Sequence, residues 1–350
     1  MLFTSRNHKL AEMSGLPFHV HPLNELSNDK SWDLLQKKVF HSDGCPSKFS
    51  NIGEKMARNC KGLPLAIAVV AGLLEIKKND IHWWKQIEKN SNSRISTEGC
   101  MAILELSYNY LPDTLKACFL YFAAYRQGEV IAVRKLMLLW IAEGLLQPEK
   151  RSLEAVAKES FLELIDRSLV IATSRSSKGG IKACRVHDLL HYFCREKAKE
   201  ESFLHVVERT EVSQCFSSPI RFDQYRLCLY SEWETLIKSK PSNPNVSSLM
   251  LFADTKESTH NSVASQIFQS FKLLKVLNLE SINLDCPFPE EIVLIVHLRY
   301  LAIRGNIMTV PSCISNLWNL ETFVLQGSYD FVQLPDTICK MKSLKHVFVS

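Results

Sequence analysis

The chain has 350 residues, a length typical of two or three domains. Hydrophobic residues make up 46% and charged residues 23%, while 12 glycines and 13 prolines are too few for a collagen-like or low-complexity protein. The net charge of +5 is uneven, because residues 1–200 carry +7 and residues 201–350 carry −2. Neither part has a dense run of Lys or Arg, so the sequence does not predict nucleic-acid binding from charge.

Neither a membrane helix nor a secretory leader is expected. No apolar stretch reaches 18 residues, and the first residues lack the charged head and apolar stretch of a signal peptide. The 11 cysteines are scattered without a Cys-x-x-Cys pair, which argues against a disulfide framework and a zinc site. His19 and His21 have no Cys or carboxylate array around them, so no metal is expected there either. We expect reduced thiols in a cytoplasmic protein, with a nuclear or membrane-associated location left open.

Residues 1–21 begin with Leu2 and Phe3, which look like the end of a strand, followed by polar Thr4-Ser5-Arg6. A strand that starts at residue 2 has no earlier strand to pair with. We therefore expect residues 1–20 to be poorly ordered, as the remnant of a domain that is truncated at its N-terminal side.

Residues 22–100 have a helical period. Ser27 can cap a helix that places Trp32, Leu35 and Val39 on one face. Another helix is expected to stop at Gly62, and Pro64 suits the first turn of the next, whose all-apolar run predicts burial at a bundle centre. A further helix is expected near 81–89, and the polar stretch 91–100 predicts a domain boundary.

Residues 101–205 carry the pattern of a winged helix. Helices are expected over 101–110, 112–125, 133–146 and 153–168, followed by short strands at 169–172 and 181–186 with a polar turn between them. Helices followed by a two-stranded hairpin are the layout of that domain.

Residues 220–350 contain a repeat of the form Leu-x-x-Leu-x-Leu. The central positions of four clear units, 277, 301, 323 and 347, follow at intervals of 24, 22 and 24 residues, and weaker units fit around 227 and 249. Pro289/Ile292, Pro311/Ile314 and Pro335/Ile338 recur at matching offsets. This period predicts a leucine-rich solenoid. Because a solenoid needs a covered end and Ser350 follows a strand directly, we also expect a C-terminal truncation.

Several short motifs precede these repeats in a characteristic order. They are Thr4-Ser5-Arg6, Gly62-Leu63-Pro64-Leu65-Ala66, Leu106-Ser107-Tyr108, Lys116-x-Cys118-Phe119-Leu120-Tyr121, Trp140-Ile141-Ala142-Glu143-Gly144 and Val186-His187-Asp188-Leu189-Leu190. Together they resemble the plant nucleotide-binding leucine-rich-repeat (NB-ARC/LRR) disease resistance proteins, coiled-coil class, late blight resistance type. The resemblance implies a multidomain α plus LRR solenoid (α/β) chain. Its order would be an NB-domain remnant (1–21), an ARC1-like helical bundle (22–100), a winged helix domain (101–205) and repeats (220–350).

The resemblance also implies a role in innate immunity. In that family an ATPase switches between ADP and ATP, with Mg²⁺ accompanying ATP, and the opened receptor triggers a hypersensitive response. Carried over residue by residue, Gly62, Leu63 and Pro64 would lie by the adenine, His187 would reach the ADP β-phosphate and Arg6 would face the terminal phosphate. A histidine at a helix start and a forked guanidinium both suit phosphate oxygens.

Simpler interpretations exist for each of these residues. Gly62-Leu63-Pro64 also fits a plain helix–helix connector, His187 a plain helix-start residue, and Arg6 a solvated charge. The sequence also departs from the family, because Gly-x-x-x-x-Gly-Lys-Ser/Thr occurs nowhere in its 350 residues. Val186 stands where the family usually has Met, and 125–129 is a degraded form of a family motif. We therefore expect a partial receptor that is not itself an enzyme, does not hydrolyse ATP, and binds ADP weakly at best.

Three classes of function remain to be compared. The first is protein recognition, with an effector or host protein contacting the strand face of the repeats through Lys275, Asn278, Arg299, Ala302, Glu321, Val324, Lys345 and Phe348. An LRR adaptor with no nucleotide role is a variant of it. The second is a winged-helix DNA-binding regulator, although the expected recognition helix has only Arg134 and Lys135 as basic residues. The third is a Cys/His enzyme, for which no local signature is present.

Overall fold

The computed structural model describes residues 21, 23–41, 43–98, 100–148, 150–177, 179–207, 225–230, 245–252, 258–259, 261–284, 287–327 and 331–350. Contacts divide the chain into two compact units, residues 1–106 and 107–350, which are treated separately below. The expected strand at residues 2–3, the expected disorder of 1–20, and Arg6 all lie outside the described residues.

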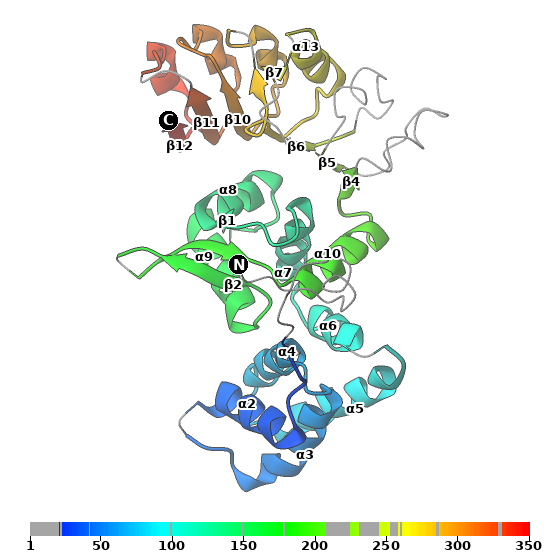
Figure 1. Ribbon diagram of the computed structural model, residues 1–350. Helices are drawn as coiled ribbons and strands as arrows, with labels where there is room; N and C mark the ends of the chain where they lie inside the picture. The colour runs from blue at the N-terminus through cyan, green and yellow to red at the C-terminus, as the bar shows by residue number, and fades with distance from the viewer. Residues whose placement is uncertain are drawn as a thin grey trace, which may run out of the picture. The chain divides into compact units, whose positions relative to one another are not determined.

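The first unit is a bundle of helices (Figure 1), namely α2 (Asn28–Phe40), α3 (Ser47–Asn59), α4 (Pro64–Glu75), α5 (Ile81–Glu98) and the first part of α6 (Cys100–Asn109). Ser27 caps α2 as predicted, because its hydroxyl accepts a hydrogen bond from the backbone N–H of Lys30 at 3.3 Å. Eight of the 12 residues of α4 are buried, which confirms its predicted central place. The polar stretch after residue 90, expected to be poor in helix, instead continues α5 to Glu98.

The second unit begins with the end of α6 and the elements of a winged helix domain. These are α7 (Asp113–Leu120), η1 (Tyr121–Ala124), β1 (Ile131–Ala132), α8 (Val133–Glu143), α9 (Leu153–Asp166), β2 (Ile171–Arg175), β3 (Ile181–Arg185) and α10 (Asp188–Glu200). The predicted hairpin is present, and β3 also pairs with β1 on its other side to give an antiparallel sheet in the order β1-β3-β2. Strand β1 was not predicted, since two residues are too few for a period to show.

The repeats form a parallel sheet in the order β12-β11-β10-β8-β6-β5-β4. Its strands are β4 (His205–Val207), β5 (Arg226–Leu229), β6 (Ser248–Leu251), β8 (Val276–Asn278), β10 (Tyr300–Gly305), β11 (Thr322–Gly327) and β12 (His346–Val349). The central residues predicted from the repeat lie side by side in register: Leu227, Leu249, Leu277, Leu301, Phe323 and Val347. This register confirms the solenoid, and β4 extends it by one strand that the sequence pattern did not reveal.

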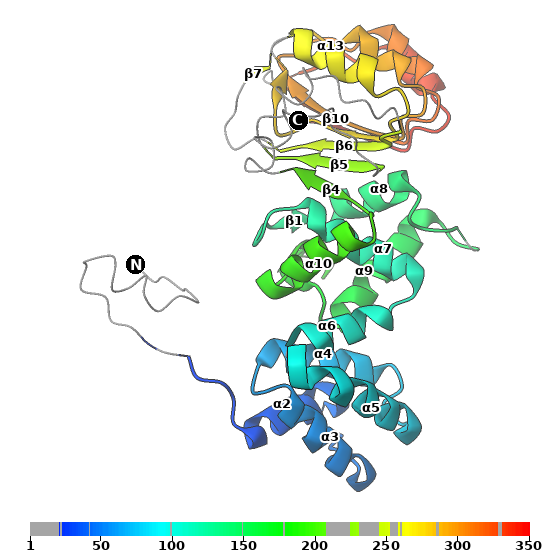
Figure 2. The same ribbon diagram turned by 90° about the vertical axis from the view of Figure 1, so that its right-hand side faces the viewer.

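A second layer, made mainly of helices, covers one face of the strands. It contains α13 (Asn261–Ser270) and the short helices η2 (Glu290–Leu294), η3 (Ser312–Asn316) and η4 (Asp336–Lys340). The small strands β7 (Ser258–Thr259) and β9 (Asn283–Leu284) belong to the sheet instead, because β9 pairs with β10 and β7 pairs with β9. Figure 2 shows the strands stacked in one layer with α13 in the layer opposite. Ile292 and Ile314, predicted from their recurring offsets, are fully buried between the layers. The other face of the strands is left without a helix layer of its own.

Candidate functional site: the strand face of the repeats and the predicted nucleotide contacts

One face of the repeat strands is not covered by the helices of the repeats themselves. Within the second unit, the winged helix domain packs against this face. Asn278, Ala302 and Thr322 project from this face at alternate strand positions, yet they are 3%, 0% and 2% exposed. Helix α8 contacts both β8 and β10. We call this contact the strand-face interface.

A buried ion pair lies within the strand-face interface. Glu143 is the last residue of α8, and its carboxylate accepts a hydrogen bond from Arg226 Nε of β5 at 2.9 Å. The Glu143 side chain is 1% exposed and the Arg226 side chain 18%. The Tyr121 hydroxyl donates to the other carboxylate oxygen at 3.2 Å, so each oxygen of Glu143 has a partner. Burial first, and the Glu143 charge second, raise the pKa of Tyr121, which keeps it a neutral donor.

The end of α8 is fixed by a second arginine from the repeats. Gly144 ends the helix in the left-handed conformation at φ 74°, which glycine adopts without strain. The carbonyl of Ala142, exposed by this ending, accepts a hydrogen bond from Arg299 Nη1 at 3.1 Å. Arg299 also pairs with Glu321 at 2.7 Å. A cation at the C-terminal end of a helix complements the negative end of its dipole.

Further contacts extend the interface along the sheet. Lys135 pairs with Glu280, and the guanidinium of Arg134 lies 4.5 Å from the centre of the Phe348 ring. His346 Nε2 lies 3.6 Å from a carboxylate oxygen of Glu154. Arg134 and Lys135 are the two basic residues that a DNA-binding α8 would need, and both are engaged by the repeats. Nothing in the structure therefore favours groove binding by this helix.

The sequence pattern predicted that partner proteins bind this strand face. In the structure, the winged helix domain of the same chain covers part of it. Of the eight positions expected to contact partners, Asn278 and Ala302 are buried and Arg299 is bonded to α8. Lys275 and Lys345 are exposed. Glu143 and Tyr121 each stood within a recognised motif, but nothing in the sequence indicated that they pair, and Arg226 belongs to no motif. The three residues meet across 83 and 22 positions of the chain.

The Gly62-Leu63-Pro64 segment forms a tight turn between α3 and α4. Gly62 has φ +68°, and a Cβ there would lie 2.4 Å from the backbone oxygen of Leu26. Its carbonyl accepts a hydrogen bond from the Leu26 N–H at 3.0 Å. Leu63 and Pro64 are exposed beside it, and Pro64 is the first residue of α4 as predicted. The turn therefore has a structural role, and it also presents apolar surface on which a base could pack.

His187 is exposed at the start of α10. Its Nδ1 accepts a hydrogen bond from the backbone N–H of Leu189 at 3.2 Å, so the neutral ring carries its proton on Nε2. A ring held in this way has one N–H free to donate to an anion. Pro64 lies in the first unit, His187 in the second, and Arg6 outside the described residues, so a common nucleotide contact of the three stays a prediction.

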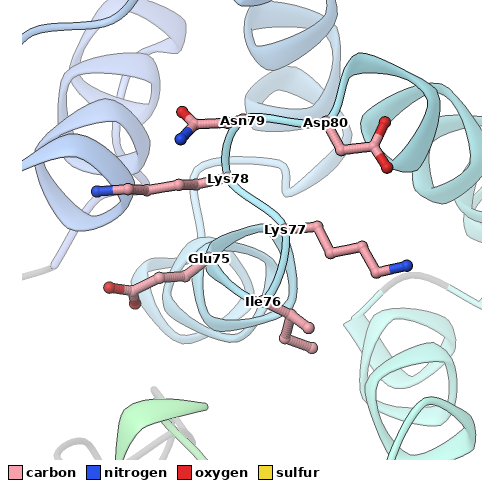
Figure 3. A pocket seen from close by; sticks show the side chains of 6 residues that line it. All are labelled: Glu75, Ile76, Lys77, Lys78, Asn79 and Asp80. Atoms are coloured by element: carbon pink, nitrogen blue, oxygen red, sulfur yellow. The ribbon is translucent and has the colours of Figure 1, made fainter.

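A surface hollow surrounds the turn between α4 and α5. It is lined by Glu75, Ile76, Lys77, Lys78, Asn79 and Asp80. Figure 3 shows these side chains fanning out from the turn in different directions, with Lys77 and Lys78 pointing apart. Because the two ammonium groups do not converge, the hollow is not arranged to hold a phosphate. Among the residues with described coordinates, no cluster of three or more His, Cys, Asp or Glu side chains could bind a metal ion.

Comparison with known proteins defines the class to which these domains correspond. Residues 125–194 match the winged helix domain of disease resistance proteins, and residues 246–350 match a leucine-rich repeat region. The winged helix of this chain is therefore similar to that of disease resistance proteins, and a leucine-rich repeat region follows it.

The relatives make the similarity more specific. The chain is 36% identical to a late blight resistance protein homolog of Solanum demissum over 364 residues, which cover 100% of this chain and 27% of that protein. It is 35% identical to the late blight resistance protein R1-A of the same plant over 366 residues, covering 100% and 28%. It is homologous to these proteins along its whole length, and it spans about a quarter of theirs. None of the helices in the described part of the chain is both long and apolar enough to cross a membrane.

Proposed function

We propose that the chain works as part of a cytoplasmic plant immune receptor of the NB-ARC/LRR kind. Its repeats hold the winged helix domain until a pathogen effector, or a host protein altered by one, is sensed. Release of the winged helix would then lead to defence and the hypersensitive response. The observation that carries this proposal is the buried Glu143–Arg226 pair, which ties the last turn of α8 to the second strand of the solenoid.

A buried ion pair suits a contact that is either closed or open. The geometry of the pair compensates the loss of water around both charges only while the partners stay together. Partial separation leaves the Glu143 carboxylate buried with Tyr121 as its one neutral donor. An intermediate arrangement is therefore costly, and a partner that binds the released strand face shifts the chain between two discrete states.

Nucleotide binding is the second part of the proposal. If ADP or ATP with Mg²⁺ binds the complete receptor, its phosphates supply the charge that distinguishes the two nucleotide states. Leu63 and Pro64 would pack against the base, the Nε2–H of His187 would donate to a phosphate oxygen, and Arg6 would approach the terminal phosphate. The exposed apolar turn and the oriented imidazole support this assignment. Because the 350 residues contain no phosphate-binding loop motif, we expect weak ADP binding and no ATP hydrolysis from this chain.

The proposal is tested by disrupting the gene in the plant that encodes it. Disrupted plants should support more growth of at least one pathogen, and the wild-type gene should restore resistance. A gene carrying Glu143→Arg should cause defence without any pathogen, because the strand-face interface cannot close around two like charges and the winged helix is released. Arg151→Glu, in an exposed pair of the same unit, is the matched control and should restore resistance fully. Unchanged growth across a pathogen panel would argue against the proposal.

A further inference from the structure

The edge of the solenoid where the chain enters the strands carries one regular column of exposed residues. The strand register aligns Leu277, Leu301, Phe323 and Val347. Five positions earlier in the same repeats stand Lys272, Val296, Trp318 and Lys342, so the column has two apolar residues between two lysines. Adjacent strands lie about 4.8 Å apart, which gives the four members a span of about 15 Å.

Each member of this column is held in place by its neighbours in the chain. The residue just before it is buried in every repeat: Phe271, Ile295, Leu317 and Met341. The turn is fixed by repeated backbone hydrogen bonds, such as Leu298 N–H to Ile295 O at 3.1 Å and Leu320 N–H to Leu317 O at 3.0 Å. The Asn319 side chain also donates to the Val296 carbonyl at 3.0 Å and joins two rungs. The column is therefore displayed on a rigid frame.

The exposed apolar side chains of this edge are large. Trp318 is 72% exposed and Val296 41%, and Leu273 and Leu294 beside them are 43% and 52% exposed. A tryptophan exposed to this degree stands out from the surface instead of lining a groove. Isolated exposed apolar residues are ordinary, but a contiguous row of them indicates a contact surface.

The charges around the row are all of one sign. The segments 270–275, 294–298, 316–320 and 340–345 contain five lysines and one histidine and no Asp or Glu. Among the residues with coordinates, Lys272, Lys340 and Lys342 are exposed and form no ion pair. Of the nearest carboxylates along the chain, Glu321 is bound to Arg299, and Glu291 accepts a hydrogen bond from Ser265. Glu290 and Asp336 are exposed in the first turns of η2 and η4, four residues before Leu294 and Lys340.

The opposite edge of the solenoid also has exposed apolar residues, but its described segments have no positive charge beside them. Phe331 is 74% and Met308 50% exposed there. The described segments 305–310 and 331–335 contain no Lys or Arg. Of these two edges, as far as their described residues show, the one with Trp318 combines protruding apolar side chains with unpaired cations, which is the combination that anionic lipid surfaces attract.

From these observations we infer that the edge formed by Lys272, Leu273, Val296, Trp318, Lys340 and Lys342 docks onto an anionic lipid bilayer. Trp318 and its aliphatic neighbours enter the headgroup region, and the lysines contact lipid phosphates and carboxylates. A flat bilayer accepts a row of protruding side chains, whereas a peptide would need a groove around Trp318. This surface is distinct from the residues of the strand-face interface.

The test measures how the full chain partitions onto vesicles. The chain should sediment with vesicles of phosphatidylcholine plus phosphatidylserine, and much less with phosphatidylcholine alone. The triple variant Lys272→Ala/Lys340→Ala/Lys342→Ala should bind about 100-fold more weakly, since each lysine contributes about fivefold. Trp318→Ala should cost about tenfold.

Matched variants separate this edge from general charge and apolarity. Lys158→Ala/Lys182→Ala/Lys199→Ala removes three exposed lysines from the winged helix domain, and Phe331→Ala removes an equally exposed aromatic residue from the opposite edge. Both should bind vesicles as the wild type does. Brominated lipid should quench the fluorescence of the wild type, and Trp318→Phe should bind nearly as well but lose that quenching.

Three results would overturn the inference. The first is equal binding to neutral and anionic vesicles, and the second is an equal loss in the two triple variants. The third is no vesicle binding by a folded wild-type chain. If an acidic peptide with apolar residues instead bound in a Trp318-dependent way, the edge would be a protein-docking surface and the lipid assignment would be wrong.

Discussion

Replacing Arg226 with methionine should destabilise the second unit strongly, because it leaves the Glu143 carboxylate buried without its cation. Methionine keeps most of the aliphatic length of arginine, so the loss is mainly electrostatic. Arg226 also donates to the carbonyl of Phe203 at 3.3 Å, and its guanidinium lies 4.4 Å from the centre of the Phe203 ring. These two contacts add to the loss of the ion pair.

The magnitude follows from the burial of the pair. The Glu143 side chain is 1% exposed, and removing one partner of such a pair costs about 3–5 kcal/mol. For a unit of this size that corresponds to a fall in Tm of about 10 °C. The double variant Glu143→Gln/Arg226→Met buries no charge, and its amide oxygen can still accept from Tyr121. It should recover at least about 2 kcal/mol of the loss.

Calorimetry of the full chain measures the transition of this unit, and native-state amide exchange locates the change at the end of α8 and in β5. Arg151→Met is the matched control, because Arg151 and Glu159 are about half exposed and such pairs contribute about 0–1 kcal/mol. The reasoning fails if Arg226→Met melts like the control. It also fails if the double variant is as unstable as the sum of the two single variants.

Three other outcomes are expected. Gly62→Ala should destabilise the first unit by about 2 kcal/mol or more in urea unfolding, because it combines positive φ with a backbone clash. The control Gly44→Ala should cost about 1 kcal/mol, because Gly44 has φ +69° but no atom within 4 Å of the added Cβ. Equal losses of stability in the two variants would contradict this. Burial lowers the pKa of His191, although its Nε2 is bonded to the Tyr125 carbonyl. The unfolded chain therefore binds more protons below about pH 6.5, and stability should fall as the pH drops from there, with a smaller slope in His191→Gln. The purified chain should show no ATP turnover, and turnover that His187→Ala abolishes would show that a complete site exists.

The fold was predictable where a period runs over many residues. The repeat spacing identified the residues that the strand register aligns, from Leu227 to Val347. The apolar run of α4 identified the centre of the first bundle. The strands β1, β7 and β9 escaped because two residues are too few for a period to show, and the three-residue β4 escaped because it was not included in the recognised repeat units. The extension of α5 to Glu98 escaped because polar residues with weak helix propensity continued a helix already formed.

The site was less predictable for a physical reason. Motifs are local, and Gly62, Pro64 and His187 could be chosen because each is part of a short stretch with defined backbone geometry. The strand-face interface depends on long-range pairs such as Lys135 with Glu280, which are 145 residues apart. Charged residues of this kind have no distinctive neighbours in the sequence. The pattern identified the strand face as a contact surface, but not that the winged helix of the same chain covers it.

The energy of the strand-face interface limits how a partner can use the repeats. A ligand that binds the strand face must first release α8, so its observed affinity is reduced by the equilibrium constant for opening. If the open state is populated at about 0.1–10%, as is usual for such two-state equilibria, that reduction is about 10-fold to 1,000-fold. The affinity of a ligand for the edge around Trp318 is not reduced in this way, because no residue of that row takes part in the strand-face interface. Weak initial attachment is therefore favoured at the edge, and only a partner with high intrinsic affinity for the strands, or one concentrated beside them, can open the interface.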